Sequence, residues 1–299
     1  MSVENFRRLL NYFQNRDLRR CPAGLVEYAD EIIRRGSDVG CNITFLNKVD
    51  RLMPIARKEA MDLDRLGLDM PSGKTWIASS LSHARGRGVR TWWAPTGGIY
   101  ICLALAPVLM RRHWGLYSLS LGVSVAEVLR DWGFDARIRW INDVMLADRK
   151  VVGILAESFR VPNASTDYIL FGIGVNVNML SFPKEISHIA TSLAIERGKS
   201  IPENRLCAHI IARIRWNFGL LHFWESRLLS SYHPPENPIV SNFKTLTDSI
   251  GKRVVFGSDA ELEPELEAWV KDVDESGNLL LLLDDGQSLL VNAGEVRYV

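Results

Sequence analysis

A short basic segment offers the first chemistry in this chain, because it interleaves arginines with glycines. It reads, in order, Arg85, Gly86, Arg87, Gly88, Val89, Arg90, Thr91 and Trp92. Each guanidinium group can donate a planar pair of hydrogen bonds to a carboxylate or phosphate, and the glycines let backbone N–H groups approach the same anion. The segment therefore predicts an anion-binding loop, although a solvated surface turn has a similar composition.

Three further motifs follow the basic loop and combine polar groups with strand-like apolar runs. They are Arg139-Trp140-Ile141-Asn142-Asp143, Lys150-Val151-Val152-Gly153-Ile154-Leu155 and Gly172-Ile173-Gly174-Val175-Asn176. Asn142 and Asp143 offer the oxygen ligands that Mg²⁺ prefers, although Asn-Asp is also common in plain turns. Asn176 follows two glycines and is suited either to contact a nucleotide or to cap a strand end.

In this order the four motifs resemble those of the biotin-protein ligase family. Members of that family carry Gly-Arg-Gly-Arg-x-Gly-Arg-x-Trp, Lys-Trp-Pro-Asn-Asp, Lys-x-x-Gly-Ile-Leu and Gly-Ile-Gly-x-Asn, and the resemblance extends over residues 43–299. It implies an α+β fold, in which a mixed-sheet catalytic domain is followed by a small SH3-like β-barrel. The implied activity is ATP-dependent adenylation of biotin to biotinyl-AMP, followed by transfer to a lysine of a biotin carboxyl carrier domain.

The resemblance also implies roles for individual residues. Arg87 and Lys150 would be catalytic, because attack of a carboxylate on the α-phosphate of ATP gathers negative charge that fixed cations stabilise. Asn142 and Asp143 would bind ATP and Mg²⁺, with Asp143 as the metal ligand. The residues implied to bind the substrate and its adenylate are Arg85, Gly86, Arg87, Gly88, Arg90, Trp92, Gly153 and Asn176. Closure of the basic loop would shield the adenylate from water.

The chain departs from the family where the acid's ring would be recognised. Family members read biotin with a Ser-Thr-Asn triplet and a Gln, whereas Arg51-Leu52-Met53 and Leu81 stand here, and Ala84 replaces the first loop glycine. Three hypotheses follow: a divergent biotin-protein ligase, a ligase for another carboxylic acid such as lipoate or a fatty acid, or a non-catalytic nucleotide-binding paralogue. Retention of Lys150 favours the two enzymes, because a binding module does not need it.

Composition sets limits on the partners. The 299 residues carry 36 Lys and Arg against 35 Asp and Glu, so no overall basic charge indicates nucleic acid, and we expect no DNA binding. No apolar run reaches the roughly 20 residues of a membrane span, and the first residues show no secretory signal. We expect a cytoplasmic protein. Its four cysteines are scattered, which argues against a zinc site or a disulfide framework. The family resemblance leaves a homodimer open.

The pattern along the chain predicts three parts. Residues 1–42 form a helical extension of two amphipathic helices split near Cys21-Pro22, too short for a winged-helix domain. Residues 43–232 alternate strands with helices, and residues 240–299 form short strands; the resemblance implies that these are the catalytic domain and the SH3-like domain. The prolines of residues 231–238 indicate a linker. The expected strands are 100–105, 168–177, 252–256, 266–273, 279–283 and 288–291, and the expected helices are 116–129, which is stopped by Gly133, and 203–224.

Overall fold

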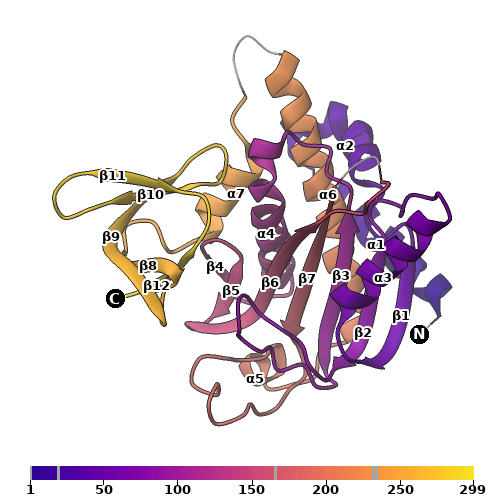
Figure 1. The fold of residues 1–299 in the computed structure, drawn as a ribbon, viewed down its shortest axis with the longest axis horizontal. Coiled ribbons are helices and arrows are strands. Elements are labelled where there is room, and N and C mark those ends of the chain that lie inside the picture. The colour runs from indigo at the N-terminus through magenta and orange to yellow at the C-terminus, as the bar shows by residue number, and fades with distance from the viewer. Residues whose placement is uncertain (1, 19–20, 165–166, 231–234) are drawn as a thin grey trace.

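The computed structural model describes residues 2–18, 21–164, 167–230 and 235–299, and it contains two sheets (Figure 1). A seven-stranded sheet has the order β1-β2-β3-β7-β6-β5-β4, and a five-stranded sheet has the order β11-β10-β9-β8-β12. In the large sheet β1 and β2 run parallel, and every other neighbouring pair is antiparallel. This arrangement confirms the predicted α+β class with a mixed sheet and a small carboxy-terminal β-domain.

The centre of the large sheet is apolar on both faces, because helices cover both faces there. Its strands are β1 (Ile43–Val49), β2 (Thr75–Leu81), β3 (Gly98–Leu105), β4 (Arg137–Arg139), β5 (Asp143–Leu146), β6 (Arg149–Phe159) and β7 (Tyr168–Asn176). All residues of β3 are buried, which is typical of a central strand. The runs predicted for residues 100–105 and 168–177 correspond to β3 and β7.

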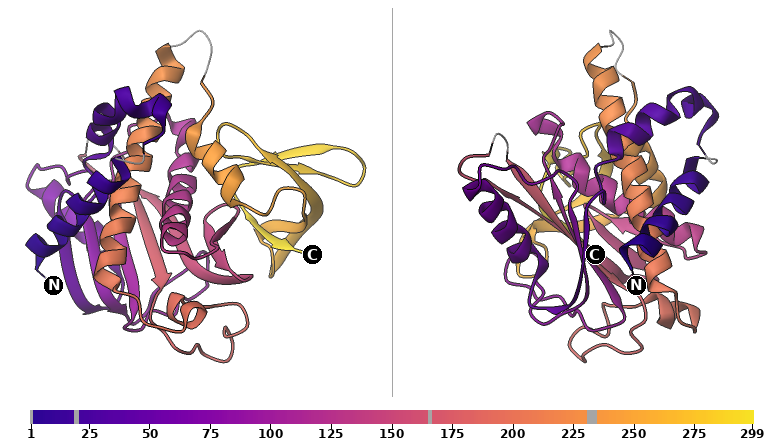
Figure 2. Two further views of the ribbon diagram at one scale, coloured as in Figure 1. Left: turned by 180° about the vertical axis from the view of Figure 1, so that it is seen from behind. Right: turned by 90° about the vertical axis from the view of Figure 1, so that its right-hand side faces the viewer.

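Helices cover the two faces of the large sheet unequally, as the right-hand view of Figure 2 shows. One face carries α1 (Val3–Leu18), α2 (Ala29–Gly36), α4 (Gly115–Asp131), α6 (Glu203–Ser230) and α7 (Pro238–Leu246), which pack around α6 and α4. The other face carries α3 (Leu52–Arg65), which packs on β2, β3 and β7. The short helix α5 (Leu193–Arg197) lies between β7 and α6 in the chain. Within the described residues, no helix has the length and apolar character needed to cross a membrane.

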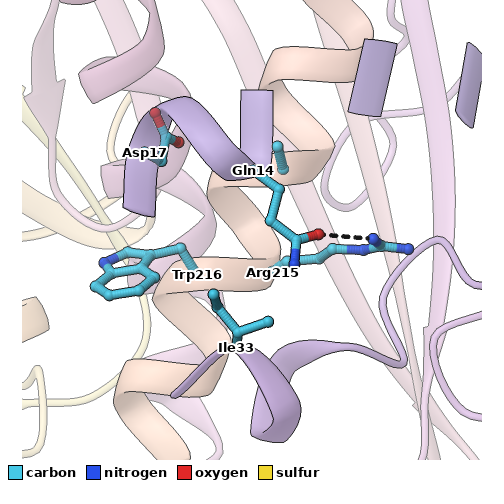
Figure 3. A pocket seen from close by; sticks show the side chains of 6 residues that line it. Gln14, Asp17, Ile33, Arg215 and Trp216 are labelled. Carbon is cyan, nitrogen blue, oxygen red and sulfur yellow. Dashed lines mark hydrogen bonds between the residues drawn. The ribbon is translucent and has the colours of Figure 1, made fainter. Parts of the chain in front are cut away.

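The two predicted amino-terminal helices are present and share the core of the sheet. Phe6, Leu10 and Phe13 of α1 and Ile32 of α2 are buried in the same apolar cluster as α6 and the sheet. A small pocket between α1, α2 and α6 has a volume of about 10 Å³, which holds roughly one water molecule (Figure 3). The division at residue 42 stays a prediction, since these helices are packed as part of the larger core.

The helices around the predicted linker differ in detail from the expectation. The helix α4 ends at Asp131 and is followed by Gly133 with φ +82°, as predicted, whereas α6 continues past residue 224 to Ser230. The predicted break at residues 231–234 lies outside the described residues. After it the chain forms α7, because Asn237 caps its backbone N–H groups and Pro238 occupies the first turn.

The carboxy-terminal sheet is antiparallel and matches an SH3-like domain. Its strands are β8 (Arg253–Asp259), β9 (Glu263–Val273), β10 (Leu279–Leu282), β11 (Ser288–Val291) and β12 (Glu295–Tyr298). Gly277 and Gly286, in the turns that join β9 to β10 and β10 to β11, have φ +83° and +86°, a backbone conformation that favours glycine. The indole of Trp140 donates a hydrogen bond of 3.1 Å to the Gly277 carbonyl, which ties this sheet to the large one.

Candidate active site

The site is built on a flat patch of the large sheet formed by two glycines. Gly153 of β6 and Gly174 of β7 are directly paired across the two strands. A Cβ atom at Gly153 would lie 2.9 Å from Cζ3 of Trp92, and one at Gly174 would lie 2.7 Å from its Nε1. The indole therefore rests directly on this glycine patch, and any larger residue at either position would displace it. The indole N–H is buried and has no hydrogen-bond partner among the described residues.

Lys150 lies at the edge of the glycine patch and places a positive charge there. The β5–β6 hairpin turns through Ala147 and Asp148, which have φ 45° and 60°, as a tight two-residue turn requires. This turn brings Lys150 Nζ to 2.7 Å from Asp143 Oδ1 and to 5.7 Å from the centre of the Trp92 ring. Because about a third of each charged side chain is exposed, the pair remains accessible to a ligand.

Two asparagines flank this centre. Asn142 donates a hydrogen bond of 2.7 Å to the Ile154 carbonyl, which fixes the turn before β5. Asn176 donates to the Thr191 carbonyl at 3.0 Å, and Thr191 in turn donates its backbone N–H to the Lys150 carbonyl at 3.0 Å. The Oδ1 atom of Asn176 is buried without a partner among the described residues. It is therefore an acceptor that a ligand donor can satisfy.

The basic loop closes on itself and reaches the carboxy-terminal domain. The backbone N–H of Trp92 donates to the Ala84 carbonyl at 2.9 Å, and the backbone N–H of Gly86 donates to the Arg90 carbonyl at 2.9 Å. Arg87 Nη1 donates to the Gly294 carbonyl at 2.8 Å. The loop thus places Arg87 against the domain formed by β8–β12, whereas Lys150 contacts Asp143 and Trp92.

Arg90 anchors the loop through two carboxylates. Its guanidinium lies 2.5 Å from Asp259 and 2.7 Å from Glu295. Burial lowers the pKa of Arg90, but hydrogen bonds and charges from Glu295 and Asp259 outweigh this effect and raise it. All three side chains are partly exposed, and such ion pairs contribute about 0.2–1 kcal/mol each. The loop is therefore held by contacts weak enough to be exchanged for a ligand.

The structure brings some of the predicted residues together and separates others. Lys150, Asp143, Gly153 and Trp92 meet at one place, with Asn142 and Asn176 beside them. Arg87 and Arg90 do not join this cluster, because their side chains contact the carboxy-terminal domain. Sequence reasoning missed Asp259, Glu295 and the segment 189–191, which carry no local motif. The catalytic and binding roles stay predictions.

Comparison with known proteins finds similar ligases. Residues 58–176 match the biotin/lipoate A/B protein ligase family. The bifunctional ligase/repressor BirA of Salmonella typhimurium is 29% identical over 234 residues, covering 74% of this chain and 65% of that protein. The biotin--[acetyl-CoA-carboxylase] ligase of Mycobacterium tuberculosis is 26% identical over 237 residues, covering 76% of this chain and 79% of that protein. The chain is thus similar to the biotin/lipoate protein ligase family over residues 58–176, and it spans about two thirds of the length of BirA.

Solved structures share the fold of this chain. The biotin protein ligase from Aquifex aeolicus, in complex with biotin and ATP, matches with a TM-score of 0.67 and 24% identity, covering 87% of this chain and all of that one. A biotin protein ligase-like protein of unknown function from Silicibacter matches with a TM-score of 0.55 and 16% identity, covering 84% of this chain and 97% of that one. At these identities the matches establish the fold.

The residues at the turn before β5 fit a Mg²⁺ ion of the kind that accompanies ATP. Mg²⁺ keeps several waters and is bound through one or two carboxylates together with substrate phosphates. Asp143 supplies one carboxylate at the edge of the patch. The amide nitrogen of Asn142 donates a hydrogen bond to the Ile154 carbonyl, which leaves the amide oxygen available as a ligand for a cation. The set suits an ion shared with phosphates and is too small for a closed protein site.

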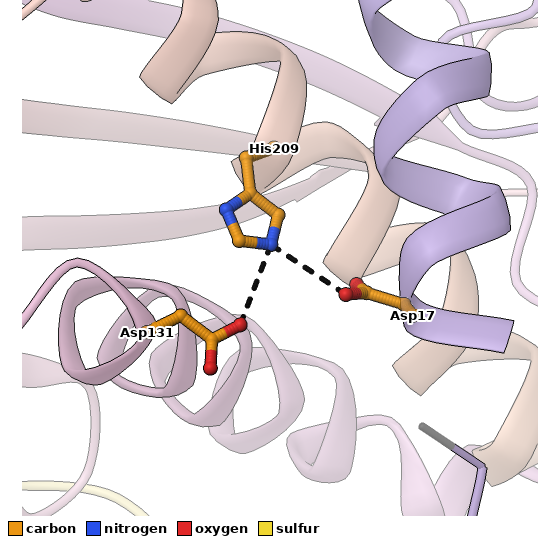
Figure 4. A group of neighbouring side chains, drawn as sticks. All are labelled: Asp17, Asp131 and His209. Carbon is orange, nitrogen blue, oxygen red and sulfur yellow. Dashed lines mark ion pairs between the residues drawn. The ribbon is translucent and has the colours of Figure 1, made fainter. Parts of the chain in front are cut away.

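A second polar group, on the helix-covered face, has a structural role. Ligand atoms of Asp17, Asp131 and His209 lie within 4.8 Å of one another (Figure 4). Arg213 bonds Asp17 at 2.8 Å and Asp131 at 3.2 Å, so the carboxylates already have a cation. Although burial raises the pKa of Asp17, His209 and Arg213 lower it to about 2. We interpret the group as an ion network that joins α1, α4 and α6.

Proposed function

We propose that this protein is an ATP-dependent biotin-protein ligase, which adenylates biotin and transfers it to a lysine of a biotin carboxyl carrier domain. The observation that carries the proposal is Lys150, held beside Asp143 at the edge of a glycine patch in a ligase fold. The names of the relatives support it: the Mycobacterium protein is a biotin--[acetyl-CoA-carboxylase] ligase, and the Aquifex structure holds biotin and ATP.

In the first step the acid is activated. A carboxylate oxygen of biotin attacks the α-phosphorus of ATP, the bond from that phosphorus to the bridging oxygen breaks, and pyrophosphate leaves. Lys150 would stabilise the negative charge that gathers at the carboxylate and phosphate, and its ammonium is held beside Asp143 at the edge of the glycine patch. Mg²⁺, held by Asp143 and Asn142, would neutralise phosphate charge. Arg87 would exchange the Gly294 carbonyl for the anion.

In the second step the acyl group is transferred. The amine of a lysine on the carrier domain attacks the carbonyl carbon of biotinyl-AMP, the bond to the phosphate oxygen breaks, AMP leaves, and the amine loses a proton. The glycine patch would lie against the acyl group, since Gly153 and Gly174 leave the sheet flat there. The basic loop would cover the adenylate and exclude water, which otherwise hydrolyses it.

The test is ATP–pyrophosphate exchange, measured with biotin, lipoate, octanoate or no acid. We expect exchange that depends on biotin, followed by labelling of an added biotin carboxyl carrier domain. Exchange that depends on another acid would reject biotin while keeping the adenylation chemistry. Nucleotide binding without exchange in any arm would support the non-catalytic paralogue instead.

One observation favours a ligase for another acid as a second candidate. The methyl group of Met53 covers Gly172, where a Cβ atom would come to 3.1 Å from it. Gly172 lies two residues before Gly174 on β7, so it faces the same side of the sheet, and this end of the patch is apolar. An apolar wall suits the chain of lipoate or a fatty acid, whereas a polar ring needs hydrogen-bond partners. The lipoate and octanoate arms test this candidate.

The proposal includes no role in DNA binding. The apolar faces of α1 and α2 are used in the core, where Phe6, Phe13 and Ile32 are buried. A full-length gel shift at physiological salt should therefore be blank. A sequence-specific, salt-sensitive shift would overturn this expectation.

A further inference from the structure

A pocket of about 330 Å³ lies on the helix-covered side of the molecule. It is bordered by the end of α1, the end of α4, the last residue of α5 and the start of α6. Its lining residues are Phe13, Arg16, Asp131, Trp132, Arg197, Pro202 and Arg205. None of them belongs to the motifs of the proposed active site.

The lining carries more positive than negative charge. It has three arginines, Arg16, Arg197 and Arg205, against one carboxylate, Asp131, so the net charge is 3 − 1 = +2. Arg16 and Arg213 both already bond that carboxylate, at 2.8 and 3.2 Å. The positive charge of the lining is therefore not balanced by the groups that border it.

Arg205 is a cation of the lining without an ion-pair partner among the described residues. Its guanidinium carbon lies 5.8 Å from the ring centres of Tyr12 and Phe13, and the described residues provide it with no carboxylate. Arg197 is likewise bound to neutral groups, since it donates to the Trp132 carbonyl and stacks at 4.1 Å on the ring of Phe134. Both arginines can accept an anion without giving up an ion pair.

The walls of the pocket are fixed before any ligand arrives. Trp132 donates its indole N–H to His209 Nδ1 at 3.0 Å, and the Phe13 ring stacks on His209 with a centroid distance of 4.2 Å and an interplanar angle of 10°. His209 is itself fully buried. Because these side chains are held in place, a ligand does not have to pay for ordering them.

We propose that this pocket binds a small phosphate-bearing ligand. Guanidinium groups match phosphate oxygens in paired, charge-assisted hydrogen bonds, and Arg is the residue best suited to this recognition. A phosphate carries close to two negative charges at neutral pH, which balances the net +2 of the lining. The site is independent of the proposed ligase reaction, because it shares no residue with the Lys150 centre.

Calorimetry on the full-length protein tests the proposal, with pyrophosphate as the probe and citrate as a matched non-phosphate anion. The decisive variant is Arg205→Gln, whose side chain is exposed and makes no ion pair with the described residues, so the fold should be kept. We expect pyrophosphate binding to weaken by about tenfold or more, the scale of one charged hydrogen bond. Citrate should bind more weakly than pyrophosphate.

Two controls separate this pocket from the active site and from general charge. Lys199→Gln removes the same charge from an exposed neighbour that does not line the pocket, and Lys150→Ala removes the cation of the proposed active site. Both should keep the Arg205-dependent binding. The proposal is wrong if Arg205→Gln binds like the parent, if citrate equals pyrophosphate, or if no pyrophosphate binds at millimolar concentration. Loss of all binding in Lys150→Ala would also reject the pocket while leaving the proposed function standing.

Discussion

The two faces of the seven-stranded sheet use the same strands in opposite ways. On β7, Phe171, Ile173 and Val175 point into the core under α1, α4 and α6, whereas Gly172 and Gly174, between them, face the site. Successive side chains on a strand alternate between faces, so one strand can carry bulk on one side and none on the other. Residues that pack into the core therefore alternate along one strand with glycines that leave the other face flat.

The charged groups of the two faces differ in the same way. On the helix-covered face, Arg213 is nearly buried and bonds Asp17, Glu127 and Asp131 within a network that joins three helices. On the open face, Lys150 and Asp143 form a single pair that is one-third exposed. The charges that join the helices are bonded on several sides, whereas the Lys150–Asp143 pair remains accessible from solvent.

The largest expected effect comes from opening the helix-covered face. Phe6 of α1 is fully buried and packs edge-on against Phe45 of β1 at 5.2 Å. Phe6→Ala should lower the free energy of unfolding by about 3–5 kcal/mol, the usual cost of such a cavity, as measured by urea denaturation. Tyr12→Ala, at an exposed position of the same helix, should change it little. Equal losses in both variants would mean that α1 is not docked as described.

A comparable effect, in rate instead of stability, is expected from the open face. Lys150→Ala should slow ATP–pyrophosphate exchange by about 10²–10³-fold, as when one charge-stabilising donor is removed, and should leave urea denaturation unchanged. Lys199→Ala, at an exposed site away from the patch, is the matched control. An unchanged exchange rate in Lys150→Ala would remove this lysine from the mechanism.

The charge network of the helix-covered face should appear in the acid stability of the protein. His209 and Arg213 overcome the effect of burial and lower the pKa of Asp17 from 3.8 to about 2. The unfolded chain therefore binds a proton at Asp17 before the folded one does, so stability falls as the pH drops from about 4 to about 2, by about 2 kcal/mol.

Denaturation at a series of pH values measures this loss. Asp17→Asn should flatten the acid limb, because its side chain no longer titrates, whereas Asp30→Asn, an exposed position on α2, should keep it. An acid limb that is the same in Asp17→Asn and the parent would contradict the assignment.

The smallest effect is expected at the rim of the open face. Glu295→Gln removes one of the two carboxylates that hold Arg90, and a partly exposed ion pair contributes up to about 1 kcal/mol. Trypsin should then cut after Arg90 up to about fivefold faster in the ligand-free protein. Glu261→Gln, exposed on the same domain, should not change the cutting rate. A loop that is cut equally fast in all three proteins would not be anchored by Glu295.

The sequence was sufficient to predict the parts of the site that are close in the chain. Asp143 and Lys150 are joined by one tight hairpin, and the two glycine motifs lie on adjacent strands. Their spacing in the sequence therefore goes far towards predicting that these residues lie close together. The same holds for the strand and helix periodicity of β3, β7 and α4, because a buried face needs apolar residues at fixed intervals.

The sequence could not predict contacts between distant segments. Arg87 donates to a backbone carbonyl of Gly294, 207 residues away, and no side chain marks that acceptor. Asp17 pairs with Arg213 across 196 residues, where many other acids and arginines were available. Such partners depend on how α1 docks on α6 and how the carboxy-terminal domain meets the loop, and neither is encoded in a local pattern.

In the ligand-free protein the indole of Trp92 lies on Gly153 and Gly174, so it competes with any ligand for the glycine patch. A ligand that binds on the glycine patch must first displace the ring. The free energy of its contacts with the patch is therefore reduced by the free energy needed to displace the indole, and its measured affinity is weaker by that amount. The same ring would then report occupancy, because leaving the patch changes its surroundings and hence its fluorescence. Replacing Trp92 with a smaller residue would leave the glycine patch uncovered, and small flat molecules of many kinds could then bind where the indole now lies.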